Sequence, residues 1–312
     1  MNRDPCARRW REVKLELRRR IAMHWIADRD YLSRLYVLKF GRGPDLRRPT
    51  GFNEKILVKI LTDRRPHLAL FADKLRVRDY VRSAAPELRL AKLYWWSARP
   101  DTLPFADLPD AFAFKANHGS GWNVLVERRS DVSAAQLVKL GRRWLRTDFT
   151  IVGREWAYRN VHRAVYAEEL LRTGESELPG DYKLFVFGGK VRVVQVDRDR
   201  FTRHTQVLYD ERWNRIDGTV AGLQGPEVPP PDSLDVMLRA AEQLSASVDF
   251  VRVDLYDIGG HAYFGELTSS PNKGLSPFRP PSLDAWFGSL LRLDDGAGES
   301  LPRYDPGAFS GR

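Results

Sequence analysis

The sequence is nearly free of cysteine, since Cys6 is the only one among 312 residues. A single thiol excludes an intramolecular disulfide bond and any metal site built from several cysteines. Disulfide-stabilised secreted folds are therefore not an option for this chain. We expect a protein of a reducing, cytoplasmic compartment.

Long apolar runs are also missing. Residues 1–25 contain no uninterrupted apolar core of the kind that a signal peptide needs, and no later window approaches the length of a membrane span. We expect a soluble or peripheral protein. Basic and apolar residues alternate between Arg8 and Arg20, which leaves two possibilities open: peripheral contact with the anionic inner face of a membrane, or a helix packed on its own domain.

Acidic residues are fewer than basic ones, 41 against 51, and the formal net charge is +10. Such a surface attracts anions, which include nucleotides, acidic glycans, nucleic acid and anionic lipids. No module with stacking aromatic residues for nucleic acid is recognisable, so nucleic acid is not an expected partner. The hydrophobic fraction of 43% is sufficient for one large or two modest domains.

The predicted strands come in hairpins separated by helices, which favours an α+β fold with antiparallel sheets over a doubly wound parallel one. Residues 1–72 are predicted to be helical, with Asn53 capping a helix that Pro66 ends. Ser133 is predicted to cap a helix that runs to about Arg146. Residues 296–312 form a tail expected to be irregular.

A hairpin near the C-terminal end carries two carboxylates. Residues 251–256 and 263–271 alternate in polarity around a turn with two glycines, and Asp254 and Glu266 are predicted to face each other across it. Opposed like charges destabilise such a pair unless a cation lies between them. Magnesium prefers oxygen ligands of this kind, although a solvated hairpin face is the simpler alternative.

A lysine and a glycine loop form the second candidate. Lys115 ends the apolar strand that starts at Phe112, and Gly119, Ser120 and Gly121 follow. Glycines allow backbone N–H groups to approach a phosphate closely, and the lysine would meet the same anion. The loop lacks the Gly-Lys-Ser/Thr of a Walker A motif. A hairpin with a solvated lysine remains the alternative.

Two further groups of polar residues are predicted. Strand alternation places Asp181, Lys183 and Phe185 on one face. A basic cluster follows, which suits an acidic substrate or forms a solvated edge. His118, next to the glycine loop, is expected to be structural. The members of the basic cluster are Arg198, Arg200, Arg203 and His204.

The order of these motifs resembles the ATP-grasp superfamily. Within it, five phrases resemble the TupA-like branch, described as ATP-grasp amidoligases linked to bacterial cell-surface polymers. The resemblance implies two α+β subdomains that grip ATP between antiparallel sheets. It divides a domain of residues 73–295 into a small part, about 90–170, and a large part, about 171–295. The phrases are Phe52 to Ile56, Ala72 to Lys74, Asp181 to Lys183, Arg252 to Tyr256 and Gly265 to Thr268.

The resemblance also implies roles for single residues in holding ATP. Lys115 matches the strand lysine that touches the α- and β-phosphates, and the loop of Gly119, Ser120 and Gly121 closes over them. Lys183 matches a second phosphate contact, and Asp181 or Glu175 would hold the ribose. The adenine hinge matches Glu168, Glu169, Leu170 and Leu171.

The implied magnesium ligands are Asp254, Glu266 and Thr268, with Arg252 nearby as a phosphate contact. Many superfamily members have Asn where this chain has Thr268. A hydroxyl is a poorer ligand than an amide oxygen, so the resemblance leaves open whether one or two ions bind. Lys115, Lys183 and Arg252 are the implied catalytic residues.

The implied activity is that of an ATP-dependent ligase that joins a carboxylate to an amine through an acyl phosphate. Its expected partners are a carboxylate substrate and an amine acceptor, an acidic glycan or peptide, on a cell-surface polysaccharide or peptide-polymer precursor. Two alternatives stay open. One is a phosphotransferase that uses the same nucleotide site to phosphorylate a glycan hydroxyl, and the other is a basic protein that binds polyanions or a membrane.

Overall fold

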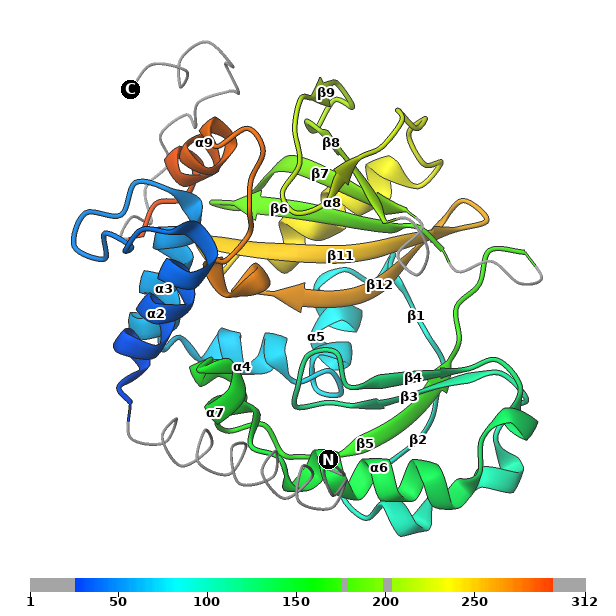
Figure 1. Ribbon diagram of the computed structural model, residues 1–312. Coiled ribbons are helices and arrows are strands. Elements are labelled where there is room, and N and C mark those ends of the chain that lie inside the picture. Colours follow the sequence, from blue (N-terminus) through cyan, green and yellow to red (C-terminus); the bar gives the residue numbers. More distant parts are fainter. Residues whose placement is uncertain (1–25, 175–178, 199–203, 294–312) are drawn as a thin grey trace, which may run out of the picture.

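The computed structural model describes residues 26–174, 179–198 and 204–293, which form two β-sheets and their covering helices (Figure 1). The predicted basic helix between Arg8 and Arg20, Glu175, Arg200, Arg203 and the tail lie outside the described residues. The described helices of eight residues or more are α2 (Asp28–Phe40), α3 (Phe52–Thr62), α5 (Val77–Ala84), α6 (Ala134–Arg146), α8 (Leu234–Leu244) and α9 (Ser282–Leu290). Shorter helical segments are α4 (Pro66–Ala72), α7 (Phe149–Gly153), η1 (Pro100–Thr102), η2 (Phe105–Asp107), η3 (Arg129–Asp131), η4 (Trp156–Tyr158) and η5 (Pro271–Gly274).

The expectation of an α+β fold is confirmed. An eight-stranded sheet has the order β1-β12-β11-β6-β7-β8-β10, with β9 paired to β8, and a four-stranded sheet has the order β2-β5-β3-β4. The large sheet is mixed because β1 and β10 join it in parallel. Its strands are β1 (Arg89–Leu90), β6 (Asp181–Phe187), β7 (Lys190–Arg198), β8 (Thr205–Tyr209), β9 (Arg215–Ile216), β10 (Leu223–Gln224), β11 (Phe250–Ile258) and β12 (His261–Thr268). The small sheet contains β2 (Leu93–Ser97), β3 (Phe112–Ala116), β4 (Asn123–Val126) and β5 (Val165–Glu169).

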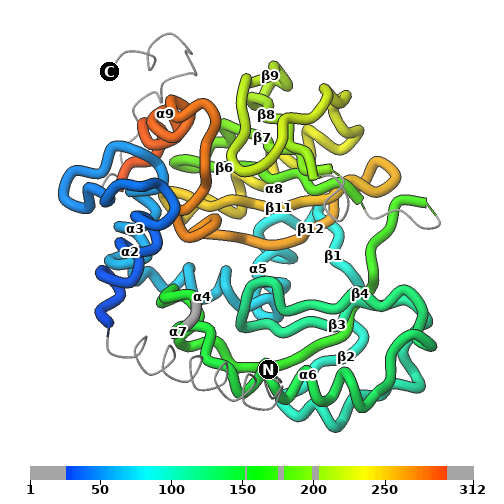
Figure 2. The backbone as a smooth tube through the Cα atoms, in the orientation of Figure 1, coloured from blue at the N-terminus to red at the C-terminus, as the bar shows by residue number. Residues whose placement is uncertain are grey.

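The chain changes sheets within a few residues after α5. The pattern predicts one strand from Leu90 to Tyr94, but the segment forms two strands, with β1 beside β12 in the large sheet and β2 beside β5 in the small one. Figure 2 shows the chain passing between the sheets at this point. A propensity argument sees only an apolar stretch here and cannot tell which partner each half will find.

Alternation along β6 and β11 gives the large sheet two apolar faces. Leu184 and Val253 belong to the core cluster that includes α5 and α8 residues, whereas Phe185 and Phe250 belong to the cluster that includes α3 and α9 residues. Asp181 and Lys183 share the face of Phe185, as the alternation predicts. On the sheet face that α3 covers, the apolar residues are therefore followed along the strands by polar ones.

Phe52 lies at the centre of that aromatic core. Its ring centroid is 5.1 Å from that of Phe250 and 5.6 Å from that of Phe287, both in edge-to-face geometry. Such pairs contribute about 0.5–1.5 kcal/mol each beyond the area they bury. The helical segment that precedes residue 73 is thus part of the packing of the large sheet.

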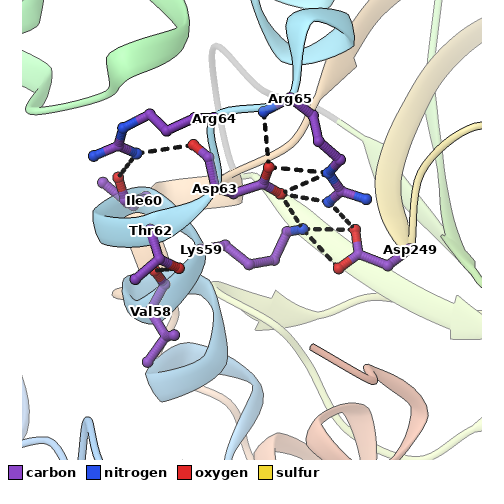
Figure 3. Close-up of polar contacts among 8 residues, drawn as sticks. All are labelled: Val58, Lys59, Ile60, Thr62, Asp63, Arg64, Arg65 and Asp249. Atoms are coloured by element: carbon purple, nitrogen blue, oxygen red, sulfur yellow. Dashed lines mark hydrogen bonds and ion pairs between the residues drawn. The ribbon is translucent and has the colours of Figure 1, made fainter. Parts of the chain in front are cut away.

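A network of four charges joins α3 to the start of β11 (Figure 3). The Lys59 ammonium lies 2.6 Å from Asp249 and 2.8 Å from Asp63, and Arg65 contacts the same two carboxylates. Losing one member of a buried network of this kind costs about 3–5 kcal/mol, because the others keep uncompensated charge. The network fixes the strand that carries Arg252 and Asp254.

The carboxylate hairpin depends on a bulge. Gly259 and Gly260, with φ of 58° and 75°, form the two-residue turn, and Ile258 pairs with His261. An unbroken ladder from that turn would place Gly265 opposite Asp254 and turn Glu266 to the other face. The register shifts at this point instead, so Asp254 pairs with Glu266. The predicted facing of the two carboxylates is confirmed.

The small sheet packs on α6. Ser133 caps this helix and the helix ends at Arg146, as predicted, and Gln136 completes a capping box with Ser133. Trp144 stacks on Phe114 of β3 with ring centroids 5.6 Å apart. This packing sets the position of β3, whose next residue is Lys115.

Asn53 does not cap α3, contrary to the prediction. The helix begins at Phe52 with Gly51 at the cap position, and the Asn53 side chain instead donates to the Ser276 carbonyl at 2.8 Å and accepts from the Ser276 N–H at 3.0 Å. Pro66 does not end the helical region either, because it is the first residue of α4. Local capping rules miss the first of these contacts, since its partner is more than 200 residues away.

Candidate functional site

The carboxylate pair of the hairpin is bound to an arginine. Arg252 donates from Nε and Nη2 to the two oxygens of Asp254, at 2.6 Å each, and from Nη2 to Glu266 at 3.3 Å. Thr268 donates its hydroxyl to the same Glu266 oxygen at 3.1 Å. The bulge therefore brings three oxygen-bearing side chains and one permanent cation to one face of two neighbouring strands.

The pKa values of the two carboxylates are shifted in opposite directions. Burial raises the pKa of Asp254 to about 6, against the pull of Arg252 and Lys183. Burial acts on Glu266 too, but the nearby Lys74 and Arg252 outweigh it and keep the pKa of Glu266 below its ordinary value. Of the two, Glu266 is the more exposed, with 39% of its side chain accessible against 8% for Asp254. Glu266 is thus the member of the pair that faces open space.

Lys183 lies directly opposite Asp254 in the pairing of β6 with β11. Its ammonium is 2.6 Å from Asp197 and 3.0 Å from Asp181, and Gln195 donates to the other oxygen of Asp197 at 2.7 Å. Burial alone would raise the pKa of Asp197, yet Lys183 holds it below its ordinary value. Lys183 is a buried lysine whose charge is matched by aspartates on both sides.

Lys115 and Glu168 form a pair in the small sheet. The Lys115 ammonium donates to Glu168 Oε1 at 2.7 Å, and Arg78 donates to Oε2 at 3.0 Å. Arg78 also contacts the carbonyl of Ala91. The Glu168 carboxylate therefore binds two cations, one from β3 and one from α5, and fixes the lysine that the sequence singled out.

The glycine loop is held from outside by Lys74. The Lys74 ammonium donates to the carbonyl of Gly119 at 2.7 Å, and Asn117 at the start of the loop donates to Asp73 at 2.9 Å. Burial lowers the pKa of Lys74, and Lys115 adds to this while Glu266 opposes it. Lys74 is thus within electrostatic reach of residues from both sheets.

The other residues predicted for the site lie at strand ends and in loops. Glu169 ends β5, and its backbone and carboxylate both pair with the backbone of Lys92, by bonds of 2.8 and 2.9 Å. Leu170 and Leu171 continue from it without regular structure. Gly121, with φ of 73°, has the left-handed conformation that glycine adopts most easily. Beyond the second hairpin, His204 lies 3.4 Å from Asp197.

His118 is enclosed by protein contacts. Its ring nitrogens lie 3.2 Å from the Asn117 side-chain oxygen and 3.1 Å from the Trp144 carbonyl. Burial lowers its pKa, which keeps the imidazole neutral. The contacts agree with the structural role expected for this residue.

A cavity of about 680 Å³ is lined by some of these residues, but Lys115, Lys183 and Asp254 are not among them. Lys74, Arg252, Glu266 and Thr268 line it from the large sheet and its connections, and Ser120 lines it from the glycine loop. Neither Arg198 nor His204 is among its lining residues. This volume is within the range that is typical of small-molecule binding sites.

The sequence pattern of the TupA-like ATP-grasp family matches residues 54–292. The chain belongs to this family. The match runs from α3 to just past the end of α9, so it contains both sheets and all the cavity-lining residues except Lys39. No curated protein has a matching sequence.

Solved structures similar to this TupA-like ATP-grasp protein include PsnB, which is named an ATP-grasp ligase. The ligase PsnB, in complex with a minimal precursor, Mg and ADP, has 14% sequence identity and a TM-score of 0.38, covering 66% of this chain and 52% of its own. D-alanine–D-alanine ligase from Bacillus anthracis with ATP has 13% identity and a TM-score of 0.39, covering 65% and 55%. The ADP complex of purK, N5-carboxyaminoimidazole ribonucleotide synthetase, has 12% identity and a TM-score of 0.44, covering 65% and 46%. The chain spans about half the length of these structures.

Several residues of the site escaped the sequence reasoning. Lys74 appeared only as part of a resembling phrase, and Arg78, Asp197 and Glu155 were not singled out. Lys74, Arg78 and Glu155 each contact a partner that is distant in the sequence, such as Glu168 for Arg78. The signal that could have found Asp197 is its position two residues after Gln195, which places both side chains on one face of the strand.

Within residues 26–174, 179–198 and 204–293, no helix combines the length and apolar character needed to cross a membrane. The same ranges contain no group of three or more His, Cys, Asp or Glu side chains placed to hold a metal. A metal in this part of the chain would therefore depend on one or two carboxylates together with other oxygen donors.

Proposed function

We propose that this TupA-like ATP-grasp protein is an ATP- and magnesium-dependent ligase that joins a carboxylate to an amine. The observation that carries the proposal is that Glu266, which lines the cavity together with Lys74, pairs with the buried Asp254 on the neighbouring strand. An acidic pair next to cationic groups suits a reaction in which a metal-bound polyphosphate meets a second substrate.

The residues present fit magnesium. Asp254, Glu266 and Thr268 supply hard oxygen donors on one face, and a bound ion would share the carboxylate oxygens with the Arg252 guanidinium. Mg²⁺ characteristically binds one or two carboxylates and completes its shell with water and phosphate oxygens. When bound, the ion would offset negative charge on the phosphates of ATP.

We assign the nucleotide to the side of Lys115. Its pairing with Glu168 fixes the lysine on β3, the strand that leads into the glycine loop, whose residues Gly119, Ser120 and Gly121 would cover the phosphates. The backbone from Glu168 to Leu171 would take the adenine, with Asp181 near the ribose. Lys183, opposite Asp254, would stand behind the phosphates together with Arg252.

The reaction proposed has two steps. A carboxylate oxygen of the first substrate attacks the γ-phosphorus of ATP, the bond to the β-γ bridging oxygen breaks, and ADP leaves with that electron pair. The amine then attacks the acyl carbon, and phosphate leaves. The chain contributes positioning and positive charge through Lys74, Lys115 and Arg252, and no side-chain nucleophile is needed.

The cavity favours an acidic substrate. Lys39 and Lys273 line it in addition to Lys74 and Arg252, so four cationic side chains line it against two acidic ones, Glu155 and Glu266. We propose an acidic glycan or peptide of a cell-surface polymer as the carboxylate partner, acted on in the cytoplasm or at the inner face of a membrane. The lysines of the cavity support this choice more directly than the cluster around Arg198.

Hydroxylamine trapping tests the proposal. The chain is incubated with ATP, MgCl₂, hydroxylamine and, in turn, D-glucuronate, D-galacturonate, L-glutamate or L-glutamyl-L-glutamate. A ligase converts the acyl phosphate of an accepted acid to a hydroxamate, with one ADP formed for each. Lys115→Met should lose this activity, and Lys139→Met, which alters an exposed lysine of α6, should retain it.

Two results would contradict the ligase function. One is the absence of hydroxamate from every acid of a broad panel while a sugar hydroxyl becomes phosphorylated, which identifies a phosphotransferase. The other is equal binding of polyanions by the wild type and Lys115→Met without any nucleotide binding, which identifies a basic binding protein.

A further inference from the structure

The cavity contains a carboxylate that the proposed reaction has not used. Among its lining residues only Glu155 and Glu266 are acidic, and Glu266 belongs to the magnesium pair. Glu155 lies between α7 and η4, in a segment that packs on α4. Figure 1 shows α4 and α7 in the region below β12.

Glu155 is attached to the end of the hairpin strand. Its Oε1 accepts a hydrogen bond from the hydroxyl of Ser270, which follows Thr268 by two positions. The residue before it, Arg154, is tied to α2 by an ion pair with Asp28 at 2.7 Å and lies over the ring of Tyr31. The Ser270 hydroxyl thus holds the carboxylate near Thr268, and the contacts of Arg154 hold the backbone next to it.

The charges around Glu155 are mainly positive. Lys74 and Lys273 act on its carboxylate from one side, and Glu266 and the Tyr158 hydroxyl are the other titratable groups close to it. Burial raises its pKa, while the two lysines oppose the rise. An ammonium group entering a cavity lined by four cationic side chains needs a negative partner, and Glu155 is the acidic lining residue left to supply one.

We propose that Glu155 is the residue that binds the incoming amine as an ammonium ion and accepts its proton, a role that rests on the ligase function proposed above. The Glu155 carboxylate takes one proton from the ammonium nitrogen. The freed nitrogen forms a bond to the acyl carbon, the bond from that carbon to the phosphate oxygen breaks, and phosphate leaves with the electron pair. The second proton of the nitrogen goes to the departing phosphate, and water later removes the proton held by Glu155.

A purely structural role for Glu155 makes a different prediction. If the carboxylate serves only to anchor Ser270, then Ser270→Ala will have the same effect as Glu155→Gln. If it serves as a proton acceptor, the Ser270 variant keeps the carboxylate and most of the activity. Glu127→Gln, which changes an exposed glutamate at the end of β4, controls for the loss of one acidic charge.

The experiment compares two nucleophiles with the acid that gives most hydroxamate. Hydroxylamine is largely unprotonated at neutral pH and needs no base, whereas methylamine is almost entirely protonated. Glu155→Gln should lower methylamide formation by about a hundredfold and change hydroxamate formation less than threefold, since general bases contribute factors of this size. Raising the pH from 7 to 9 should narrow the methylamine defect, because free methylamine becomes available.

The outcomes separate the two proposals. No hydroxamate from the wild type means that the ligase function is wrong, and the role of Glu155 is lost with it. Hydroxamate without any methylamide from the wild type contradicts the role of Glu155 alone. So does an equal loss with both nucleophiles in Glu155→Gln, or a loss in Ser270→Ala that matches it.

Discussion

Arg252 donates two hydrogen bonds, each of 2.6 Å, to the carboxylate of Asp254, two positions further along the same strand. This cation compensates the carboxylate pair of the hairpin without any bound ion. The magnesium ion proposed for this pair would therefore contact the same oxygens as Arg252. Metal binding and the stability of the hairpin should depend on each other.

Replacing Arg252 by Met should expose that dependence. Without the guanidinium, Asp254 and Glu266 repel each other in a mainly buried setting, and we expect the free energy of unfolding to fall by about 3 kcal/mol. Millimolar MgCl₂ should then raise the melting temperature of the variant more than that of the wild type, as measured by calorimetry. The double variant Arg252→Met with Asp254→Asn removes the repulsion. Its melting temperature should therefore rise with MgCl₂ about as little as that of the wild type. An equal magnesium effect on all three proteins would speak against a metal at this pair.

Lys115→Met should weaken nucleotide binding. Removing a lysine that contacts phosphates costs roughly 1.5–3 kcal/mol, the value of a charge-assisted hydrogen bond, which corresponds to at least a tenfold loss of affinity. Titration calorimetry with magnesium and a non-hydrolysable ATP analogue measures this directly. Glu168 keeps its bond to Arg78, so the fold should persist. Unchanged affinity in Lys115→Met would place the nucleotide elsewhere.

Gly265→Ala should damage the bulge that turns Glu266 toward Asp254. A Cβ atom at this position would lie 2.8 Å from the backbone oxygen of Asp254, closer than real Cβ contacts. We expect a loss of about 1–3 kcal/mol in the free energy of unfolding, as for other overpacked sites, and a weaker response to magnesium. Gly43→Ala is the matched control, because nothing lies within 4 Å of the added atom. Wild-type stability in urea unfolding of Gly265→Ala would show that the strand relaxes easily.

Asp284 should make stability depend on pH. Burial raises its pKa to about 6 from the ordinary value of 3.8, although the backbone N–H of Asn53 donates to it. A carboxyl with a raised pKa stabilises the fold most at low pH, and this contribution is lost as the pH rises through 6. Between pH 5 and 8 the free energy of unfolding should fall by about 1.4 kcal/mol more in the wild type than in Asp284→Asn. Parallel pH profiles in urea denaturation would show that Asp284 titrates normally.

The sequence is informative where local chemistry determines the outcome. Ser133 caps the helix that its pattern predicts, and Asp181, Lys183 and Phe185 share the face that strand alternation predicts. The facing of Asp254 and Glu266 is also correct, but for a reason that the pattern does not contain. A regular ladder from the turn would have separated them, and the bulge depends on the close packing of Gly265 against the Asp254 backbone.

Long-range contacts are the part that the sequence does not reveal. The Lys74 side chain reaches the carbonyl of Gly119, and Glu155 reaches Ser270, through folding of segments that are far apart in the chain. Short edge strands such as β9 and β10, of two residues each, have no pattern long enough to recognise. Charges are visible in a sequence, but their partners are set by tertiary structure.

The two hydrogen bonds between the Asn53 side chain and the backbone of Ser276 have a practical consequence for shortening the chain. Removing the residues up to 72 would delete Asn53, Phe52 and Lys59 together. The aromatic face of the large sheet would then be exposed to water, and Asp249 would lose its lysine. A fragment that starts at residue 73 should therefore aggregate, whereas one that keeps α3 retains the part needed for folding.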